Sequence, residues 1–148
     1  MRGPFITGQF DHTLDDKGRV TLPAKYRKLF EEHAYLVEST DGAECVAVYH
    51  ADSWAEHDEV YIEPKNKFDE PAESTSVRGI YSFMHDMVPD KQGRIMVPQD
   101  FVEQLGLKDK VKIVGNRDHL ELWHPDTFAR EIQEYRRMKA ERRRARAS

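Results

Sequence analysis

The chain has 148 residues and a formal net charge of −4, with 39% hydrophobic and 34% charged residues. Its single cysteine, Cys45, excludes an internal disulfide and is typical of a reducing compartment. No apolar run approaches the roughly 18 residues of a membrane span, and the first ten residues lack the features of a secretory signal. We expect a cytoplasmic protein with no membrane partner, folded as one domain or two small ones.

The charge is distributed unevenly along the chain. From Arg130 onward there are eight Arg/Lys and three Glu residues, whereas the remainder holds 15 basic and 24 acidic residues, a net of −9. Because neutralisation of phosphates drives non-specific binding to nucleic acids, an acidic body argues against indiscriminate polyanion binding. Any nucleic-acid contact is therefore expected from local basic patches, to which the basic tail adds non-specific affinity.

The first half of the chain predicts two strands, a helix, two more strands and the start of a helix. Alternating or helical apolar spacing, with an Asp-Gly hairpin in the second pair of strands, indicates these elements. In chain order they are a strand in 5–14, a turn at 15–18, a strand at 19–22, a helix at 23–32, strands at 34–38 and 45–49, and a helix beginning at 50–54.

The second half repeats this order. Gly106 is expected to end its helix, since glycine adopts the left-handed conformation that closes many helices. Gly115-Asn116 is expected to join its last two strands. The elements are a strand in 83–88, the turn and strand of 90–97, a helix at 98–105, strands at 111–114 and 120–123, and a helix beginning at 124–128.

One motif occurs twice, as DDKGRVTLP at 15–23 and as DKQGRIMVP 75 positions later at 90–98. Both copies place Asp, Gly, Arg and Pro identically, and the surrounding elements repeat as a ββαββα unit of about 45 residues. Gly18 and Gly93 stand where a three-residue hairpin loop needs a positive φ. Beyond each glycine, apolar residues alternate with Arg19 or Arg94, so the arginines face away from the core.

Two interpretations of the arginines remain open. Asp15–Arg19 and Asp90–Arg94 can be structural ion pairs that stiffen their turns, which at exposed positions contribute only about 0–1 kcal/mol. Alternatively, the arginines are offered to a planar, bidentate partner such as a guanine edge or a phosphate. A two-stranded ribbon has the dimensions to enter a major groove.

The remaining segments divide the chain into four parts. The acidic stretch 55–76, with Pro64 and Pro71, reads as a linker with a little order at 60–62. The last helix continues as an amphipathic stripe before a basic tail that is expected to be disordered alone. The divisions are a first repeat at 5–54, a linker at 55–76, a second repeat with its C-terminal helix at 77–135 and a tail at 136–148.

Signs of catalysis are weak. The seven histidines lack metal-ligand spacing, and the chain has no phosphate-cradling glycine loop and no nucleophile elbow. His50 and His124 recur at equivalent places, but each precedes a helix start and is better explained as a cap. We therefore expect no enzyme, no metal, no cofactor and no small-molecule substrate.

The doubled motif resembles the MraZ family of bacterial transcriptional regulators, relatives of the AbrB/MazE-type DNA-binding folds. The resemblance rests on the two D-x-x-x-R motifs, each running into a G-R-hydrophobic-x-hydrophobic-P strand, and on the residues FITG and HTL before the first motif. It spans roughly residues 5–135. It implies an α+β, mainly β fold, a double-split, swapped-hairpin AbrB-like barrel closed by both halves.

The resemblance also implies a function. Protomers of the family assemble into closed homo-oligomeric rings that bind short direct repeats upstream of the division and cell-wall gene cluster, including the regulator's own promoter, so a nucleoid-associated protein is expected. Asp15, Gly18, Asp90 and Gly93 would shape the turns. The residues expected to contact double-stranded DNA are Arg19, Lys17, Arg94, Lys25 and Arg27.

A second function class stays open. The chain could instead be an oligomeric adapter that binds another protein through its acidic faces, with arginine turns that are purely structural. Closely spaced short direct repeats upstream of the gene would favour the regulator, and their absence would favour the adapter.

Overall fold

The computed structural model describes residues 4–66 and 71–148. The strands are β1 (Gln9–Thr13), β2 (Arg19–Thr21), β3 (Ala34–Glu38), β4 (Val46–His50), β5 (His85–Met87), β6 (Arg94–Met96), β7 (Lys110–Asn116) and β8 (His119–Trp123). The helices are η1 (Ala24–Phe30, 3-10), α1 (Ala51–His57), η2 (Asp58–Ile62, π-helical), α2 (Glu63–Asn66), α3 (Pro71–Phe83), α4 (Gln99–Leu105) and α5 (Pro125–Ala147).

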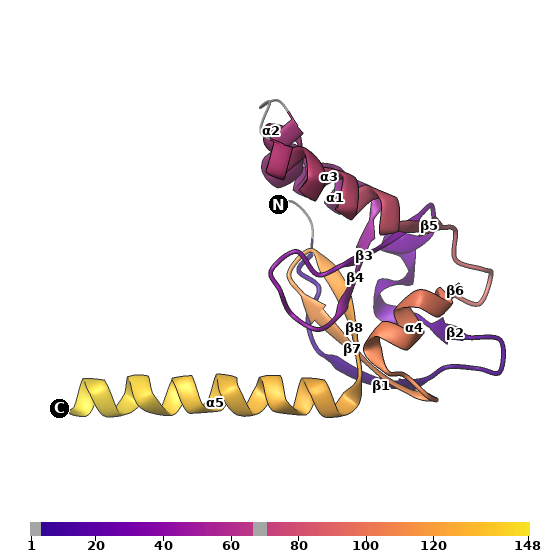
Figure 1. The fold of residues 1–148 in the computed structure, drawn as a ribbon. Coiled ribbons are helices and arrows are strands. Elements are labelled where there is room, and N and C mark those ends of the chain that lie inside the picture. Colours follow the sequence, from indigo (N-terminus) through magenta and orange to yellow (C-terminus); the bar gives the residue numbers. More distant parts are fainter. Residues whose placement is uncertain (1–3, 67–70) are drawn as a thin grey trace.

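The fold is α+β, with the strands in one six-stranded antiparallel sheet and one two-stranded ribbon (Figure 1). The sheet has the order β1-β7-β8-β4-β3-β5, and the ribbon pairs β2 with β6. Each strand that precedes a repeated turn pairs with the opposite half of the chain, β1 with β7 and β5 with β3. The two halves are therefore joined by strand pairing at four places: both of these, the ribbon, and the pairing of β4 with β8.

Elements follow the predicted order in both halves, with two local differences. The helix predicted from Pro23 forms as the 3-10 helix η1. The turn between β7 and β8 lies at Arg117-Asp118, where Arg117 has φ 69°, and not at Gly115-Asn116 as predicted. Gly115 stays within β7 because its N–H donates to the Gly8 carbonyl at 2.9 Å, which ties the N-terminal segment to the sheet.

The main core lies between one face of the sheet and the ribbon with η1 and α4. The predicted alternation is confirmed, since Val20 and Leu22 are fully buried and Ile95 and Val97 nearly so. Gly106 ends α4 at φ 67°, as predicted. Further members of this core are Ile6, Tyr26, Phe30, Leu36, Val48, Phe101, Val111, Ile113, Leu120 and Leu122.

Two smaller apolar clusters form on the opposite face of the sheet. Trp54 and Ile62 of the α1–η2 segment pack over Val37 and Tyr49 of β3 and β4. The stretch expected to be a linker at 55–76 is therefore largely helical in its described residues, and residues 67–70 lie outside them. Its acidic composition and two prolines gave no indication that Ile62 would be buried, because that burial depends on the sheet beneath it.

The third cluster anchors α5, where Phe128 packs on Trp123 and Cys45. The tail expected to be disordered is a continuation of this helix to Ala147, which runs away from the body of the molecule (Figure 1). Its residues are strong helix formers, and Arg137 pairs with both Glu134 and Glu141 along the helix. None of the described helices is long and apolar enough to cross a membrane.

The two recurring histidines are helix caps, as predicted. His50 Nδ1 accepts the Ser53 N–H at 3.4 Å, and the Ser53 hydroxyl oxygen accepts the His50 N–H at 3.1 Å, which forms a reciprocal capping box. His124 Nδ1 accepts the Asp126 N–H at 3.0 Å. These contacts satisfy backbone donors that the first turn of a helix leaves without partners.

Candidate nucleic-acid interface

The first repeated turn is organised by the carboxylate of Asp15. Its Oδ1 accepts the backbone N–H groups of Lys17 at 2.9 Å and Arg19 at 2.8 Å, and its Oδ2 accepts Arg19 Nε at 2.8 Å. Gly18 has φ 78°, the positive value predicted for it. One carboxylate thus closes the turn and orients the guanidinium that follows.

The second turn has the same geometry with one addition. Asp90 accepts the backbone N–H groups of Gln92 and Arg94 at 3.0 and 2.9 Å, and Arg94 Nε at 2.7 Å, while Gly93 has φ 76°. Arg94 Nη2 also donates to Gln92 Oε1 at 2.7 Å. Among the described residues, Arg19 has no such second partner, so it has more guanidinium donors available for a ligand than Arg94.

The ribbon places both arginines on one face. Its register pairs Arg19 with Met96, Val20 with Ile95, and Thr21 with Arg94. Opposite residues of an antiparallel pair point to the same side, and the Val20–Ile95 pair is buried. The outer face of the ribbon therefore carries Arg19, Thr21, Arg94 and Met96, of which Met96 is 47% exposed.

Backbone bonds across the ribbon lock each turn to the other half. The Leu22 N–H donates to the Gly93 carbonyl at 2.8 Å, and the Val97 N–H donates to the Gly18 carbonyl at 2.9 Å. Arg27 of η1 lies against the second turn, since a Cβ built on Gly93 would stand 2.5 Å from its Cδ. The two turns are consequently held in a fixed relation to each other.

The other predicted contact residues differ in how free they are. Lys17 is exposed at the tip of the first turn, and Lys25 is exposed on η1 with its Nζ 5.4 Å from the centre of the Tyr26 ring. Arg27 uses its Nε to donate to the Leu22 carbonyl at 3.0 Å. Arg27 thus has a structural contact that the sequence did not indicate.

The sequence-based set omitted Thr21 and Met96. Both stand opposite a motif arginine, and both become candidates only when the two repeated strands are known to pair with each other. The repeat itself was the available indication, because similar strands from two repeated units can pair with each other antiparallel about an approximate twofold axis.

Acid should weaken the two turns together. Backbone hydrogen bonds from Arg19 and Arg94 lower the pKa of Asp15 and Asp90 below the ordinary value of 3.8. The unfolded chain then binds more protons than the folded one in this range, so the free energy of unfolding falls as pH drops from about 4 through the folded pKa values. We expect Asp15→Asn with Asp90→Asn to flatten this fall in denaturant titrations between pH 5 and 2.5. Equal slopes for variant and wild type would contradict it.

Sequence comparison identifies the family. The family described as "MraZ protein, putative antitoxin-like" matches residues 5–78 and 83–148, so each matched segment contains one of the two repeated turns. The chain belongs to the MraZ family. The doubled D-x-x-x-R turn is thus found in a chain that matches the family over nearly its whole length.

Several curated MraZ relatives are similar to the chain over most of its length. A protein of Caldicellulosiruptor saccharolyticus is 33% identical over 131 residues, 86% of each chain. One of Limosilactobacillus reuteri is 35% identical over 83% of this chain and 84% of its own, and one of Thermomicrobium roseum is 29% identical over 85% and 86%. All three are named "Transcriptional regulator MraZ".

Proposed function

We propose that this MraZ family member is a DNA-binding transcriptional regulator that acts on short direct repeats upstream of its own division and cell-wall gene cluster. One observation carries the proposal. The ribbon presents two arginines from matched turns on a single outer face, each oriented by an aspartate. The names of the curated relatives support the same role.

The ribbon enters the major groove with its outer face toward the bases. A two-stranded ribbon fits that groove, and arginine is the usual bidentate partner of guanine O6 and N7. Asp15 holds Arg19 through Nε, which leaves the two Nη groups to donate to a base edge. Lys17 at the turn tip supplies a phosphate contact, which sets register without reading sequence.

The ion pairs are compatible with this role. An exposed pair contributes little stability, and a side chain already held in one rotamer loses less entropy on binding. The adapter interpretation assigns the same pairs a stiffening role alone. The two functions are distinguished by the effect of removing Arg19. The regulator requires a loss of DNA binding, whereas the adapter requires only a loss of turn stability.

Self-association answers the problem of the acidic body. A single ribbon is a small positive patch on a chain with net charge −4, but a closed homo-oligomeric ring places several ribbons on tandem repeats. Linked sites act at effective concentrations of millimolar order without any new contact. We infer in addition that the sheet and ribbon constitute the swapped-hairpin AbrB-like barrel, which the exchanged β1 and β5 pairings support.

Footprinting on the gene's own upstream DNA tests the proposal. The purified full chain should protect closely spaced short repeats in one register, and a matched fragment with scrambled repeats should show no protection at the same salt concentration. Binding should weaken steeply as salt rises, because each phosphate contact releases counterions. Equal affinity for intact and scrambled fragments would refute sequence-specific regulation and favour the adapter.

A further inference from the structure

Helix α5 has an apolar and basic face that continues beyond the point where the helix leaves the body. Phe128 is buried and Ile132 is partly buried against the sheet. Helical spacing places Tyr135 on the same face, and Tyr135 is 57% exposed. We call this continuation the α5 stripe, and its residues line a shallow depression: Tyr135, Met138, Lys139, Arg142, Arg143 and Arg146.

The projecting part of α5 has the properties of a segment that needs a partner. From Tyr135 to Ala147 it holds seven basic residues and one glutamate. An isolated helix of about 12–15 residues is marginal in water, and like charges at helical spacing weaken it further. Tyr135 and Met138, at 57% and 42% exposure, do not suit a sugar-phosphate surface. The composition instead fits an acidic protein surface with apolar contacts.

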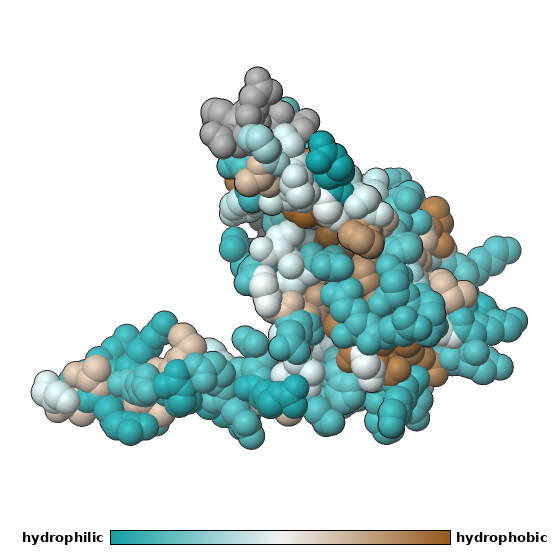
Figure 2. All heavy atoms as spheres, in the orientation of Figure 1, coloured by the Kyte–Doolittle hydropathy of each residue, from teal (hydrophilic) through white to brown (hydrophobic). Residues whose placement is uncertain are grey.

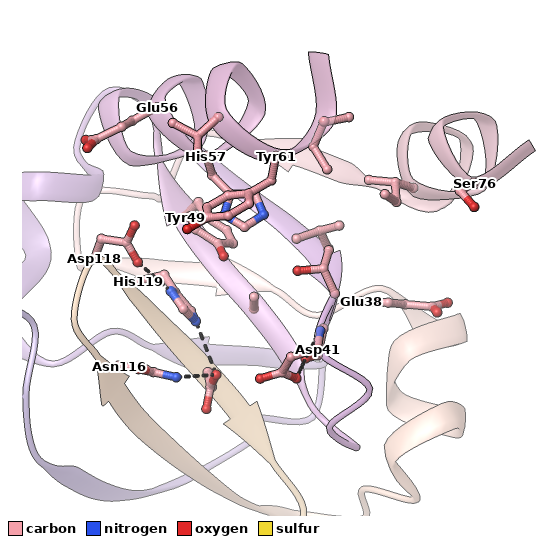
Figure 3. Close-up of a pocket in the computed structure, with 18 of the residues that line it drawn as sticks. Glu38, Asp41, Tyr49, Glu56, His57, Tyr61, Ser76, Asn116, Asp118 and His119 are labelled. Carbon is pink, nitrogen blue, oxygen red and sulfur yellow. Dashed lines mark hydrogen bonds and ion pairs between the residues drawn. The ribbon is translucent and has the colours of Figure 1, made fainter. Parts of the chain in front are cut away.

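Such a surface lies elsewhere on the same chain. A pocket of about 920 Å³ opens over the outer face of the sheet, bounded by the α1–η2 and α3 helices and by the β3–β4 and β7–β8 hairpins (Figure 3). We call it the acidic pocket. Among its described lining residues, carboxylates outnumber lysine and arginine by five to two: Glu38, Asp41, Glu56, Asp118 and Glu121 against Lys65 and Arg117.

Aromatic rings line the interior of the acidic pocket. Tyr49 stacks on His119 with ring centres 4.5 Å apart, and His57 lies 5.1 Å from Tyr49 and 5.0 Å from Tyr61. Arginine guanidinium groups bind well to such faces. Apolar side chains line the pocket at Val60, Tyr61 and Phe83, all more than half exposed.

Most of the pocket carboxylates already have partners, and Glu38 is the exception among the described residues. Glu121 is 6% exposed, bonds Trp123 Nε1 at 3.0 Å and pairs with His119 at 3.1 Å. Asp118 pairs with the other nitrogen of His119 at 2.8 Å. Glu38 is the last residue of β3 and lies exposed at the rim of the pocket (Figure 3), and its side chain has no hydrogen-bond or ion-pair partner among the described residues. Glu38 is therefore a ready acceptor for an incoming arginine.

We propose that the α5 stripe of one copy docks in the acidic pocket of a second copy. The two surfaces are complementary in charge. Each also carries exposed apolar side chains that could pack against the other. Docking within one chain is not possible in this arrangement, because α5 projects away from the end of the molecule where α1 and α3 lie (Figure 1). The visible surface of the projecting helix is mostly hydrophilic (Figure 2). The contact joins different surfaces on its two partners, so repetition generates a closed ring or a filament. The inference rests on the self-association in the proposed function.

Engineered cysteines test this contact directly. Burial raises the pKa of the Cys45 thiol, and that residue is 2% exposed, so introduced thiols dominate oxidation. The full chain with Glu38→Cys and Arg142→Cys should give a ladder of disulfide-linked multimers under mild oxidation. Glu38→Cys with Arg144→Cys, on the opposite helix face, should give no ladder. Failure of the first variant to link, or linkage that stops at dimers, overturns the proposal.

Charge reversal provides the second test. Arg142→Glu with Arg146→Glu should reduce the mass measured by sedimentation without DNA, and Glu38→Arg should restore part of it. Arg130→Glu with Arg144→Glu makes the same change in net charge on the opposite face of α5 and should leave the mass unchanged. Unchanged mass in the stripe variant overturns the inference, and if DNA affinity falls there instead, α5 is a DNA contact. Because DNA binding is tested separately through Arg19, the regulator role can survive that result.

Discussion

Replacing Arg19 with alanine is expected to abolish protection of the promoter repeats, while the protein stays folded and its oligomeric mass in solution is unchanged. The variant loses the guanidinium that has the most donors available at the ribbon. A contact of this type contributes about 1–3 kcal/mol for each protomer, which is roughly a fivefold to 150-fold loss in affinity. In the proposed ring several protomers bind tandem sites together, so the losses multiply.

The comparison variants make the Arg19 result specific. Arg94→Ala should weaken protection less, because Gln92 already occupies part of that guanidinium. Arg78→Ala removes an arginine from α3, which packs on the face of the sheet opposite the ribbon, and should leave protection unchanged. Gel-shift titration and thermal unfolding would be measured on all three. Wild-type affinity in Arg19→Ala would refute base reading by this residue, and a lower melting temperature without a change in affinity would support the adapter.

Gly115→Ala should have the largest effect on stability among the glycine-to-alanine variants. A Cβ at this position would stand 2.6 Å from the backbone nitrogen and carbon of Thr7, which cannot move without releasing the N-terminal segment. That segment is held by Gly8, Ile6 and Arg117 backbone bonds of 2.7–3.0 Å, and Ile6 is 1% exposed. Displacing one buried aliphatic side chain costs about 2–4 kcal/mol, or roughly 5–15 °C in melting temperature.

Gly79→Ala is the matched control for this variant. Gly79 lies inside α3, and a Cβ there would meet nothing within 4 Å. Alanine is the better helix former by up to about 1 kcal/mol, so this variant should unfold at the same or a slightly higher temperature. Equal melting temperatures for the two variants would show that the Thr7–Gly115 contact is not a rigid one.

The parts of the structure that were predictable are those built from local interactions. Each Asp-x-x-x-Arg turn is closed by bonds between residues at most four apart, and the histidine caps join residues two or three apart. The chemistry of such contacts is contained within a short window of sequence. The motif arginines and their outward direction were identified on this basis, and the DNA contact itself stays a prediction.

Contacts between segments that are distant in the sequence could not be predicted from local patterns. The helices at 55–76 follow from contacts of Trp54 and Ile62 with β3 and β4, which the acidic composition conceals. The turn lies at Arg117 because Gly115 is held within β7 by a hydrogen bond from its N–H to the carbonyl of Gly8, on the N-terminal segment. Likewise, the contact of Arg27 with Gly93 joins the two halves of the chain and could not be predicted from either segment alone.

The sequence by itself determined the two rigid turns, the order of the repeated elements and the inward face of the two strands that follow the turns, because these depend on neighbours within a few residues. Only the tertiary structure decided that the two turns share one ribbon, that an acidic pocket opens on the outer face of the sheet, and that α5 leaves the body with its stripe uncovered. Those features arise from burial of apolar faces contributed by both halves, and the free energy of burial depends on which faces meet in space.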